Sequence, residues 1–406
     1  MADALITSFD PSDTGLYTDD IWREPFARQR REAPVSYLPD SPYGPYWSVC
    51  TLDLIQQVET NTEIFSSSYK HGGITIGANI ESADREFPNF IAMDGERHAA
   101  QRKVVQPSFN PSEMTRRDVE IRERTKALFD DLPIGEEFDW VERVSIPLTM
   151  GMLCILFDFP FEERQDLKRW SDWASEVTPD NSPERYGQFL EQMGQMLARF
   201  DRLLEEKRQL PPSDNLMSRI IHSAAMGSMD PMERIANIAL LIVGGNDTTR
   251  NSMSGLIDAF RCYPAALDQL KADPSLIPTA VQEIIRWQSP VTHMRRTCTQ
   301  DTELNGQKLS KGDMVVMWYI SANRDESVFP NGDIFDVTRD NARRHAAFGH
   351  GVHRCVGARL AELQLASLLH EIVSRNVTIE MQGAPDRLSS CFLHGFTKMP
   401  VVMRPN

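Results

Sequence analysis

The sequence has no apolar run long enough to cross a membrane. The longest such runs, near residues 148–159 and 238–245, fall well short of the roughly 20 residues that a membrane helix needs. The first residues, MADALITSFDPSDTGLY, are acidic and lack the basic and then apolar regions of a secretion signal. We therefore expect a cytoplasmic protein without a membrane span.

Closely spaced cysteines are missing as well. A structural zinc site usually takes cysteine or histidine pairs at short spacing, and a disulfide framework takes many cysteines in a short chain. Here no two cysteines lie within four residues of each other, which excludes both patterns and fits a reduced chain. The six are Cys50, Cys154, Cys262, Cys298, Cys355 and Cys391.

Positive charge is in deficit. The chain has 43 Lys and Arg against 58 Asp and Glu, for a net charge of −15. This balance argues against nucleic acid as a partner. A local exception is a group of four arginines, which is either a solvated surface or a docking face for an acidic protein: Arg343, Arg344, Arg354 and Arg359.

What is present is an ordinary globular composition, 41% hydrophobic and 25% charged, without repeats, low-complexity segments or linkers. We predict one domain, residues 1–406, mainly α-helical with a minor β region. The clearest helix spans about 231–260, because Asp230 is a good N-cap, Pro231 suits the first helical position and Glu233 completes a capping-box-like pair. We also predict loops with a short strand or two before about residue 80, helices near 276–287 and 356–374, and strands at 302–304 and 314–319.

The stretch FGHGVHRCVG places Cys355 among three glycines and two histidines. It is not a nucleotide-binding G-x-G-x-x-G loop, because Arg354 occupies the position of the third glycine. It also lacks the second ligand pair of a zinc site. A buried structural cysteine is an alternative, but it leaves the glycines, His353 and Arg354 unexplained, whereas a ligand to a larger group would account for them.

The predicted central helix contains LLIVGGNDTTRNS, a run poorly suited to a helix interior. Adjacent Gly244 and Gly245 cost about 1 kcal/mol each relative to alanine. The hydroxyls of Thr248 and Thr249 can bond back to the preceding turn and bend the helix. Either the glycines form a packing notch against another helix, or they form a groove in which a ligand lies beside Asp247 and Thr248.

A third pattern is HAAQR, in which His98 and Arg102 are four residues apart and share one helix face. The pair is either part of a plain surface or a site for an anionic ligand such as a carboxylate. Arg296 and His353 could join it at the same ligand.

These motifs resemble those of cytochrome P450 proteins. FGHGVHRCVG matches their haem-thiolate loop, F-x-x-G-x-(R/H)-x-C-x-G, GGNDTT matches (A/G)-G-x-(D/E)-T-(T/S) in their central helix, and EIIRW matches their E-x-x-R. The three occur in the family's order and separations, and the resemblance covers essentially the whole chain. It implies the fold of a bacterial P450, with haem b as cofactor and a long central helix crossing the domain over the haem.

The resemblance also implies roles for individual residues. Cys355 would be the thiolate ligand of the haem iron and would favour O–O cleavage. Thr248 and Asp247 match the alcohol and the acid that deliver protons in catalysis, and Gly244 would leave room for dioxygen and substrate. The other cofactor-binding positions are the propionate-binding residues His98, Arg102, Arg296 and His353, together with Phe348 and Gly357 of the loop.

One element departs from the family pattern. Glu283 and Arg286 of EIIRW can form a structural pair on a helix, and the family usually adds an arginine from a P-x-R-F element. Here the matching stretch is NGDIFDVTR, with Ile334 at the arginine's place. Arg339, five residues on, is a candidate substitute.

The subgroup most similar to the quoted motifs hydroxylates the terminal carbon of n-alkanes and medium-chain fatty acids. We therefore expect an apolar chain as substrate, in a pocket lined by mostly apolar residues. Alternatives are a P450 that hydroxylates another hydrophobic compound, such as a terpenoid, an aromatic or a steroid, and a peroxide-driven haem enzyme. The predicted pocket residues are Phe87, Ile91, Met93, Leu241, Val243, Gly244, Val291, Met294, Phe392 and Phe396.

No flavin or ferredoxin segment accompanies the predicted domain. The resemblance therefore implies that electrons come from a separate iron–sulfur ferredoxin and its reductase, and that dioxygen is the oxidant. The four arginines near the Cys355 loop would form the docking face for the acidic ferredoxin. We expect the protein to be a monomer that binds no nucleic acid.

Overall fold

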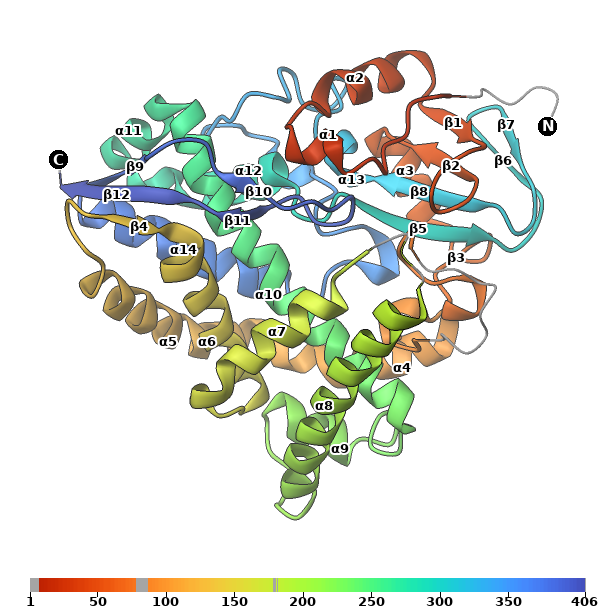
Figure 1. Cartoon of the computed structure of the whole chain (residues 1–406), viewed down its shortest axis with the longest axis horizontal. Helices are drawn as coiled ribbons and strands as arrows, with labels where there is room; N and C mark the ends of the chain where they lie inside the picture. Colours follow the sequence, from red (N-terminus) through yellow and green to blue (C-terminus); the bar gives the residue numbers. More distant parts are fainter. Residues whose placement is uncertain (1–6, 78–86, 178–179, 181, 406) are drawn as a thin grey trace.

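The computed structural model describes residues 7–77, 87–177, 180 and 182–405. Helices dominate and the β region is minor, as the sequence predicts. The larger part of the β region is gathered at one side of the molecule (Figure 1). The α-helices are α1 (Gly15–Thr18), α2 (Arg23–Glu32), α3 (Leu52–Thr60), α4 (Gly95–Val105), α5 (Pro111–Asp130), α6 (Ile146–Phe157), α7 (Arg164–Ala174), α8 (Pro183–Arg208), α9 (Leu216–His222), α10 (Pro231–Cys262), α11 (Pro264–Ala272), α12 (Ile277–Gln288), α13 (Tyr319–Ala322) and α14 (Ala358–Ser374).

The strands form small sheets. The largest has the order β1-β2-β8-β5-β3, in which β2 and β8 are parallel and the other neighbours are antiparallel. A three-stranded sheet, β4-β12-β9, holds the end of the chain. The strands are β1 (Val35–Leu38), β2 (Tyr46–Val49), β3 (Phe65–Ser66), β4 (Glu137–Asp139), β5 (His293–Cys298), β6 (Thr302–Leu304), β7 (Gln307–Leu309), β8 (Met314–Trp318), β9 (Val377–Met381), β10 (Asp386–Arg387), β11 (Phe396–Lys398) and β12 (Pro400–Pro405).

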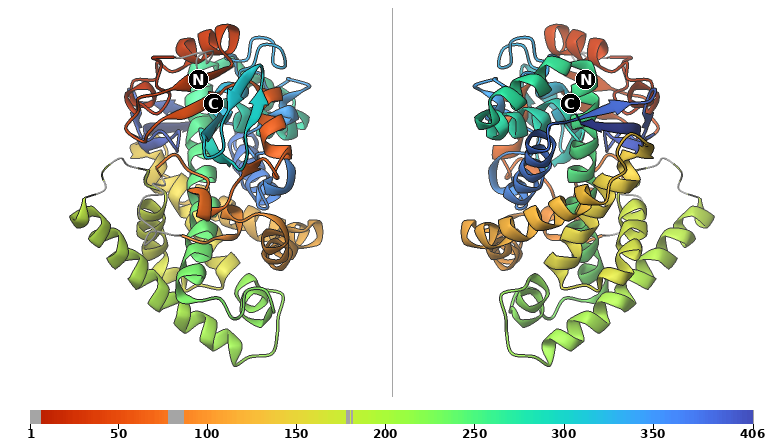
Figure 2. Two further views of the ribbon diagram at one scale, coloured as in Figure 1. Left: turned by 90° about the vertical axis from the view of Figure 1, so that its right-hand side faces the viewer. Right: turned by 90° about the vertical axis from the view of Figure 1, so that its left-hand side faces the viewer.

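Helix α10 forms where the sequence predicts the longest helix. The Asp230 carboxylate accepts the backbone N–H of Glu233 at 2.9 Å, so the predicted N-cap is present. With 32 residues at 1.5 Å each, α10 is about 48 Å long. It runs through the middle of the molecule (Figure 2), and α6, α7, α12 and α14 pack against it. Helix α10 is therefore held by neighbouring helices on several sides.

The first part of the chain has the short strands that were predicted, but it also has helices that were not. Helices α2 and α3 are present there in addition to the strands β1, β2 and β3. Helix α3 buries Leu52, Ile55 and Val58, which lie three residues apart on one face. Helix α2 is rich in charged residues and buries Phe26 and Ala27. Short helices of this kind gain most of their stability from packing, which leaves a weak signal in the sequence.

Apolar side chains from α5, α6, α8, α10, α12 and α14 form the main core, and a second core lies on the five-stranded sheet. The helix predicted near residues 356–374 contributes to the main core, because Leu365, Leu368 and Ile372 of α14 have no exposed surface. In the part of the chain that the structure describes, no helix has both the length and the apolar character needed to cross a bilayer.

A buried group of charges fixes the segment that leads to Cys355. Glu283 and Arg286 of α12 form a bidentate ion pair at 2.7 Å, with no exposed surface on either side chain. Arg339 donates to the same carboxylate at 3.1 Å, so the candidate substitute does complete the triad. The backbone carbonyl of Ile334 accepts from both arginines at 3.1 Å. We call Glu283, Arg286 and Arg339 the closed cluster.

Candidate active site

The loop that carries Cys355 is shaped by close contact with α3. Gly349 and Gly351 both have φ of +66°, a conformation that favours glycine. A side chain at Gly351 would begin 3.0 Å from the backbone oxygen of Glu59, at the end of α3. The N–H of Cys355 donates to the carbonyl of Phe348 at 2.8 Å and closes the loop. The glycines are thus needed for this loop conformation.

Cys355 lies just before α14 and combines two properties. Its side chain is exposed, yet burial raises the pKa of its thiol. The backbone N–H groups of Gly357 and Ala358, and the charges of Arg354 and Arg102, act in the opposite direction and favour the thiolate. The thiol therefore has accessible surface although its surroundings are dense. The donors and the helix N-terminus suit a thiolate that binds a metal ion.

Phe348 and Gly357 lie within the same loop. The half-buried ring of Phe348 contacts the imidazole of His345, with centroids 5.3 Å apart, and the guanidinium of Arg354, 5.7 Å from its centroid. Gly357 approaches the ring of Phe109, which a Cβ would meet at an ordinary 3.8 Å. Phe348 therefore covers one side of the cysteine loop.

The four residues predicted to bind propionates come together from three elements. His98 and Arg102 lie on α4, Arg296 lies on β5 and His353 precedes Cys355 in the loop. The rings of His98 and His353 are 4.2 Å apart. Burial lowers the pKa of His353 to about 2, and so do three neighbouring positive charges: Arg296, His98 and Arg102.

Several nitrogens of this group are buried without a hydrogen-bond partner among the described residues. They are Nε2 of His98, Nε of Arg296 and both ring nitrogens of His353. Glu59 is a carboxylate neighbour, but its oxygen is 3.8 Å from Arg296. Buried donors nearly always find acceptors, so the group fits a ligand that brings carboxylates, as haem does with its two propionates. We call His98, Arg102, Arg296 and His353 the open cluster.

The two adjacent glycines of α10 have different surroundings. A Cβ on Gly244 would meet nothing within 4 Å, and the residue is exposed although α10 is central. A Cβ on Gly245 would lie 2.6 Å from Leu153 of α6. Both interpretations of the sequence therefore hold, one for each glycine: Gly244 opens a space, and Gly245 permits close helix packing. The hydroxyl of Thr248 donates to the carbonyl of Gly244 at 3.1 Å.

The carboxyl group of Asp247 is fully buried between α10 and α7. It accepts from the hydroxyl of Ser171 at 2.9 Å and from the amide of Asn246 at 2.9 Å. It also pairs with Arg250 at 2.8 Å. Burial raises the pKa of Asp247, and Arg250 opposes this effect. None of the described contacts joins this carboxyl to Thr248, so the predicted acid and alcohol lie on different sides of α10.

The predicted pocket residues occupy several elements. Val291 forms an antiparallel bridge with Leu393, which brings together the segments that carry Met294 and Phe392. Phe87 packs against Phe189 of α8, with centroids 6.0 Å apart. The set comprises the buried Met93, Leu241, Phe392 and Phe396, the half-buried Phe87, Ile91, Val243, Val291 and Met294, and the exposed Gly244.

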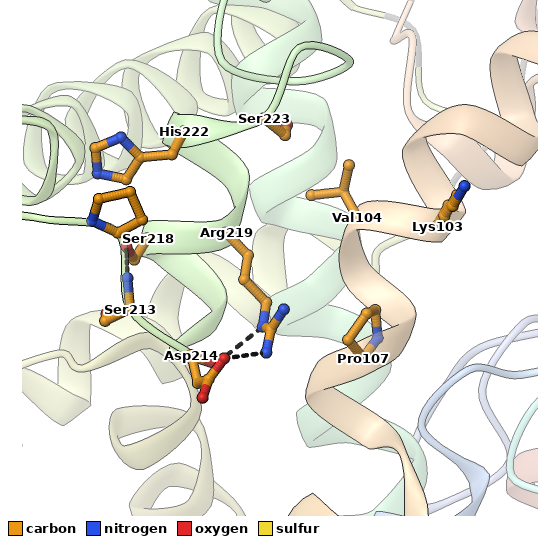
Figure 3. Close-up of a pocket in the computed structure, with 10 residues that line it drawn as sticks. Lys103, Val104, Pro107, Ser213, Asp214, Ser218, Arg219, His222 and Ser223 are labelled. Carbon is orange, nitrogen blue, oxygen red and sulfur yellow. Dashed lines mark hydrogen bonds and ion pairs between the residues drawn. The ribbon is translucent and has the colours of Figure 1, made fainter.

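Two hollows in the structure lie apart from most of the predicted site. One, of about 440 Å³, lies between the end of α4 and the α9 region (Figure 3). It is lined by polar and charged side chains, and its Arg219 is paired with Asp214 at 2.5 Å. The other, of about 710 Å³, includes Phe396 and Arg250 in its wall. Phe396 thus lines a space that also contains Arg250, the ion-pair partner of Asp247.

Sequence reasoning did not single out four of these site neighbours. Glu59, Ser171, Asn246 and Arg250 reach the site through folding rather than through a motif of their own. Ser171 is 76 residues from Asp247, and Glu59 is more than 200 residues from Arg296. Of the four, only Asn246 and Arg250 could have been found from the sequence, because they lie within or beside the GGNDTT motif.

Comparisons with known proteins agree with this geometry. The sequence profile of the family described as "Cytochrome P450" matches residues 269–398. The chain is 37% identical over 402 residues to the linalool 8-monooxygenase of Pseudomonas putida, covering 96% of this chain and 97% of that one. The chain therefore belongs to the cytochrome P450 family. It is a haem-thiolate monooxygenase, as the motifs predicted.

Two solved bacterial structures are particularly similar. Cytochrome P450-153 from Novosphingobium aromaticivorans has a TM-score of 0.93 and 49% identity, covering 97% of this chain and 99% of that one. CYP153D17 from Sphingomonas sp. has a TM-score of 0.93 and 50% identity, covering 98% and 100%. A methyl-branched lipid omega-hydroxylase of Mycobacterium tuberculosis is 32% identical over 395 residues, covering 94% of this chain and 91% of that one.

Proposed function

We propose that this monooxygenase hydroxylates the terminal carbon of an apolar chain, an n-alkane or a medium-chain fatty acid. The observation that carries its haem chemistry is the pairing of an exposed Cys355, which receives two backbone N–H groups, with an open cluster that holds buried nitrogens without a hydrogen-bond partner among the described residues. Haem bound there would supply the activation of dioxygen and the insertion of one oxygen atom into a carbon–hydrogen bond. Cys355 would hold the iron, and the open cluster would bind the propionates.

The residues of α10 would serve the other side of the same cavity. The open space at Gly244 would admit dioxygen and the end of the substrate chain. The hydroxyl of Thr248 would move protons there, and Asp247 would supply them from behind the helix. Because the carboxyl of Asp247 is bonded to Ser171 and Asn246, it has to exchange partners to serve Thr248.

The names of relatives support oxidation at a chain end. The mycobacterial relative is an omega-hydroxylase of methyl-branched lipids, so it acts at the terminal carbon. The predicted pocket residues are apolar, which suits a hydrocarbon chain. A terminal C–H bond is stronger than an internal one, so selectivity has to come from a pocket that presents only the chain end. The linalool relative favours a second candidate, an acyclic terpenoid substrate.

The role of Cys355 has a direct spectroscopic test. The reduced protein with bound carbon monoxide should show the red-shifted Soret band of thiolate-ligated haem. Cys355→His should lose that band, whereas Cys262→Ser, which changes an exposed cysteine elsewhere, should keep it. A wild-type band at the position of histidine-ligated haem would contradict the assignment.

Substrate class is tested by titrating the holoenzyme with n-alkanes, fatty acids and acyclic terpenoid alcohols of graded length. We expect the spectral change of water displacement from iron to be largest for one range of alkane or fatty acid lengths, and the product to carry oxygen at the terminal carbon. Tighter binding and turnover of the terpenoid alcohols would favour the second candidate.

For the electron donor, we propose a separate acidic ferredoxin that binds around the cysteine loop. Four arginines there are exposed, and none pairs with a carboxylate of the described residues: Arg343, Arg344, Arg354 and Arg359. Val352, 54% exposed in the same loop, offers an apolar contact. The whole chain has a net charge of −15, which repels an acidic ferredoxin. Attraction by these arginines has to overcome that repulsion.

Charge reversal tests this docking face. Arg343→Glu with Arg344→Glu should slow reduction by ferredoxin at low salt and leave the haem spectrum unchanged, because electrostatic steering is screened as salt rises. The matched control is Lys308→Glu with Lys311→Glu, two exposed cations of the β7 region. Equal rates for both double variants would place the docking face elsewhere.

A further inference from the structure

The middle of α10 has accessible surface along a single strip. Within residues 235–250, those that are exposed or half-buried are Leu240, Val243, Gly244, Gly245 and Thr248. Leu240, Gly244 and Thr248 are four residues apart, so they share one face of the helix. Gly244 and Thr248 are the residues that we assign to the space for dioxygen and to proton transfer. A substrate chain that reaches them would therefore lie along this strip.

Asn237 marks the end of the strip. It lies three residues before Leu240 and seven before Gly244, on the same face of α10 and about 10 Å from Gly244 along the helix axis. There the strip is covered by the segment 87–93, which carries three of the predicted pocket residues. The backbone N–H of Phe90 donates to Oδ1 of Asn237 at 3.0 Å, and both residues are buried. Among the hydrogen bonds between described residues, it is the only one that joins this segment to α10.

The side chain of Asn237 is itself held in place. Its amide nitrogen donates to the carbonyl of Glu233 at 3.0 Å and to Oε1 of Gln101 on α4 at 3.4 Å. The amide of Gln101 in turn donates to the carboxylate of Glu233, which also pairs with Arg97 at 2.7 Å. An asparagine can both accept and donate, and here both ends of the amide are used. The oxygen that receives the Phe90 N–H therefore has a fixed position between α4 and α10.

The other hydrogen bonds of the segment 87–93 lie within it. Asn89 accepts the N–H of Ala92 at 3.1 Å and donates to the carbonyl of Phe87 at 3.3 Å, so the segment forms a compact turn of its own. The ring of Phe87 packs against α8. Because these contacts shape the segment without placing it on α10, its position along the strip depends on the bond to Asn237.

We propose that Asn237 determines chain-length specificity in this monooxygenase, by holding the segment 87–93 across the accessible strip of α10. With the segment in place, the space along the strip ends about two turns from Gly244, and a chain of matching length presents its terminal carbon there. A longer space would let the chain slide and present an interior carbon. This inference rests on the proposed oxidation at a chain end, and it names the residue that limits the length of the chain.

The central test is Asn237→Leu in the holoenzyme, titrated with graded n-alkanes and with the matching fatty acids. We expect the chain length of tightest binding to increase, and the share of product oxidised at an interior carbon to rise several-fold. Binding of the chain that the wild type prefers should weaken about fivefold, as expected for one lost hydrogen bond. The matched control is Asn341→Leu, which removes an asparagine that bonds to the carbonyl of Val328 at 2.6 Å in another part of the fold.

A second measurement does not depend on turnover. In hydrogen–deuterium exchange of the holoenzyme, peptides that cover residues 87–93 should exchange several-fold faster in Asn237→Leu than in wild type or Asn341→Leu, because local opening becomes easier. Peptides from α5 and α14 should exchange as in the wild type. Faster exchange in all peptides alike would show a general loss of stability instead, and would overturn the specific role of Asn237.

Two further variants separate the bond to Phe90 from the packing around it. Asn237→Asp keeps an oxygen that can accept the Phe90 N–H, so it should keep most of the wild-type length preference. The hydroxyl in Asn237→Ser can bond back to the carbonyl of Glu233 but is too short to reach Phe90, so this variant should behave like Asn237→Leu. The serine variant also provides the test if the leucine disturbs folding.

Failure of this inference differs from failure of the proposed function. If the wild type oxidises the chain end, and Asn237→Leu and Asn237→Ser keep both its length preference and its terminal product, Asn237 does not set chain length and the proposed function stands. If the wild type oxidises no alkane or fatty acid at the terminal carbon, both are overturned.

Discussion

Two groups of basic side chains, the closed cluster and the open cluster, differ in how their hydrogen-bond donors are satisfied. In the closed cluster, Arg286 makes two bonds of 2.7 Å to Glu283 and donates to three backbone carbonyls. In the open cluster, both ring nitrogens of His353 lack a partner among the described residues. Basic side chains therefore find all their hydrogen-bond acceptors within the protein in the closed cluster, whereas in the open cluster some donors find none among the described residues.

The difference separates structural from ligand-binding charge. A buried arginine whose donors all meet protein acceptors needs nothing further. Buried donors without acceptors lower the stability of the folded protein until a ligand supplies acceptors. The stability of the folded protein then depends on that ligand. The closed cluster should therefore affect folding with or without haem, whereas the open cluster should affect haem binding.

The largest expected effect comes from opening the closed cluster. Glu283→Gln removes the carboxylate that Arg286 and Arg339 share, and breaking a buried ion pair in this way costs about 3–5 kcal/mol. Urea unfolding of the holoenzyme should show this loss, and the apoprotein should show it too. As a control, Ile334→Ala trims a side chain that is 46% exposed and should change stability by no more than about 0.5 kcal/mol. A loss confined to the holoenzyme would show that the two clusters are not independent.

The closed cluster also shows how much of the structure could be predicted from the sequence. The pairing of Glu283 with Arg286 follows from helical spacing, and Arg339 was a candidate because it was the nearest arginine after Ile334. The Cys355 loop, the central helix and the division into α and β regions were likewise predicted, since glycines, caps and motif spacing are local features. The same motif singled out Asp247, whose role in proton delivery stays a prediction.

The features of the site that could not be predicted from the sequence depend on contacts between segments that are far apart in the chain. Ser171 has no motif, and only the packing of α7 on α10 brings its hydroxyl to Asp247. Gly244 and Gly245 look equivalent in the sequence, and only the position of Leu153 assigns one to packing and the other to open space. Phe396 was predicted to line the substrate pocket as part of the C-terminal turn; it lies in the wall of the 710 Å³ cavity, and its contact with substrate stays a prediction.

His293, a buried histidine outside both clusters, should make the stability of the fold depend on pH. Nδ1 of His293 donates to the carbonyl of Cys391 at 3.0 Å, and Nε2 accepts the N–H of Ile76. Burial lowers the pKa of His293 to about 4, although the bond to Cys391 opposes this. Its folded pKa is therefore below the unfolded value near 6.5, so the unfolded chain binds more protons between these two pH values.

The sign follows from this difference. The contribution of His293 is fully present above about pH 6.5 and is lost as pH falls toward 4, by about 3 kcal/mol in total. Urea unfolding between pH 7 and pH 4 should show a smaller pH slope for His293→Asn than for wild type. His222→Asn, which changes an exposed histidine, is the control and should keep the wild-type slope. Identical slopes in all three proteins would mean that His293 is not held neutral by the fold.

The smallest effect on folding, and the most specific one, is expected from the open cluster. His353→Ala and Arg102→Ala each remove a donor that we assign to a haem propionate, and a hydrogen bond to a charged group is worth about 1.5–3 kcal/mol. Transfer of haem from the holoenzyme to apomyoglobin should therefore be about tenfold to a hundredfold faster in each variant, since 1.4 kcal/mol corresponds to a factor of ten. Unfolding of the apoprotein should change little for His353→Ala, because both ring nitrogens lack a partner among the described residues, and only slightly more for Arg102→Ala, because Arg102 donates to the carbonyl of Arg354. Arg359→Ala, an exposed arginine of the same region, should retain haem as wild type does. If haem loss is unchanged in both variants, or if the apoprotein is destabilised as strongly as by Glu283→Gln, the open cluster is a structural group like the closed one.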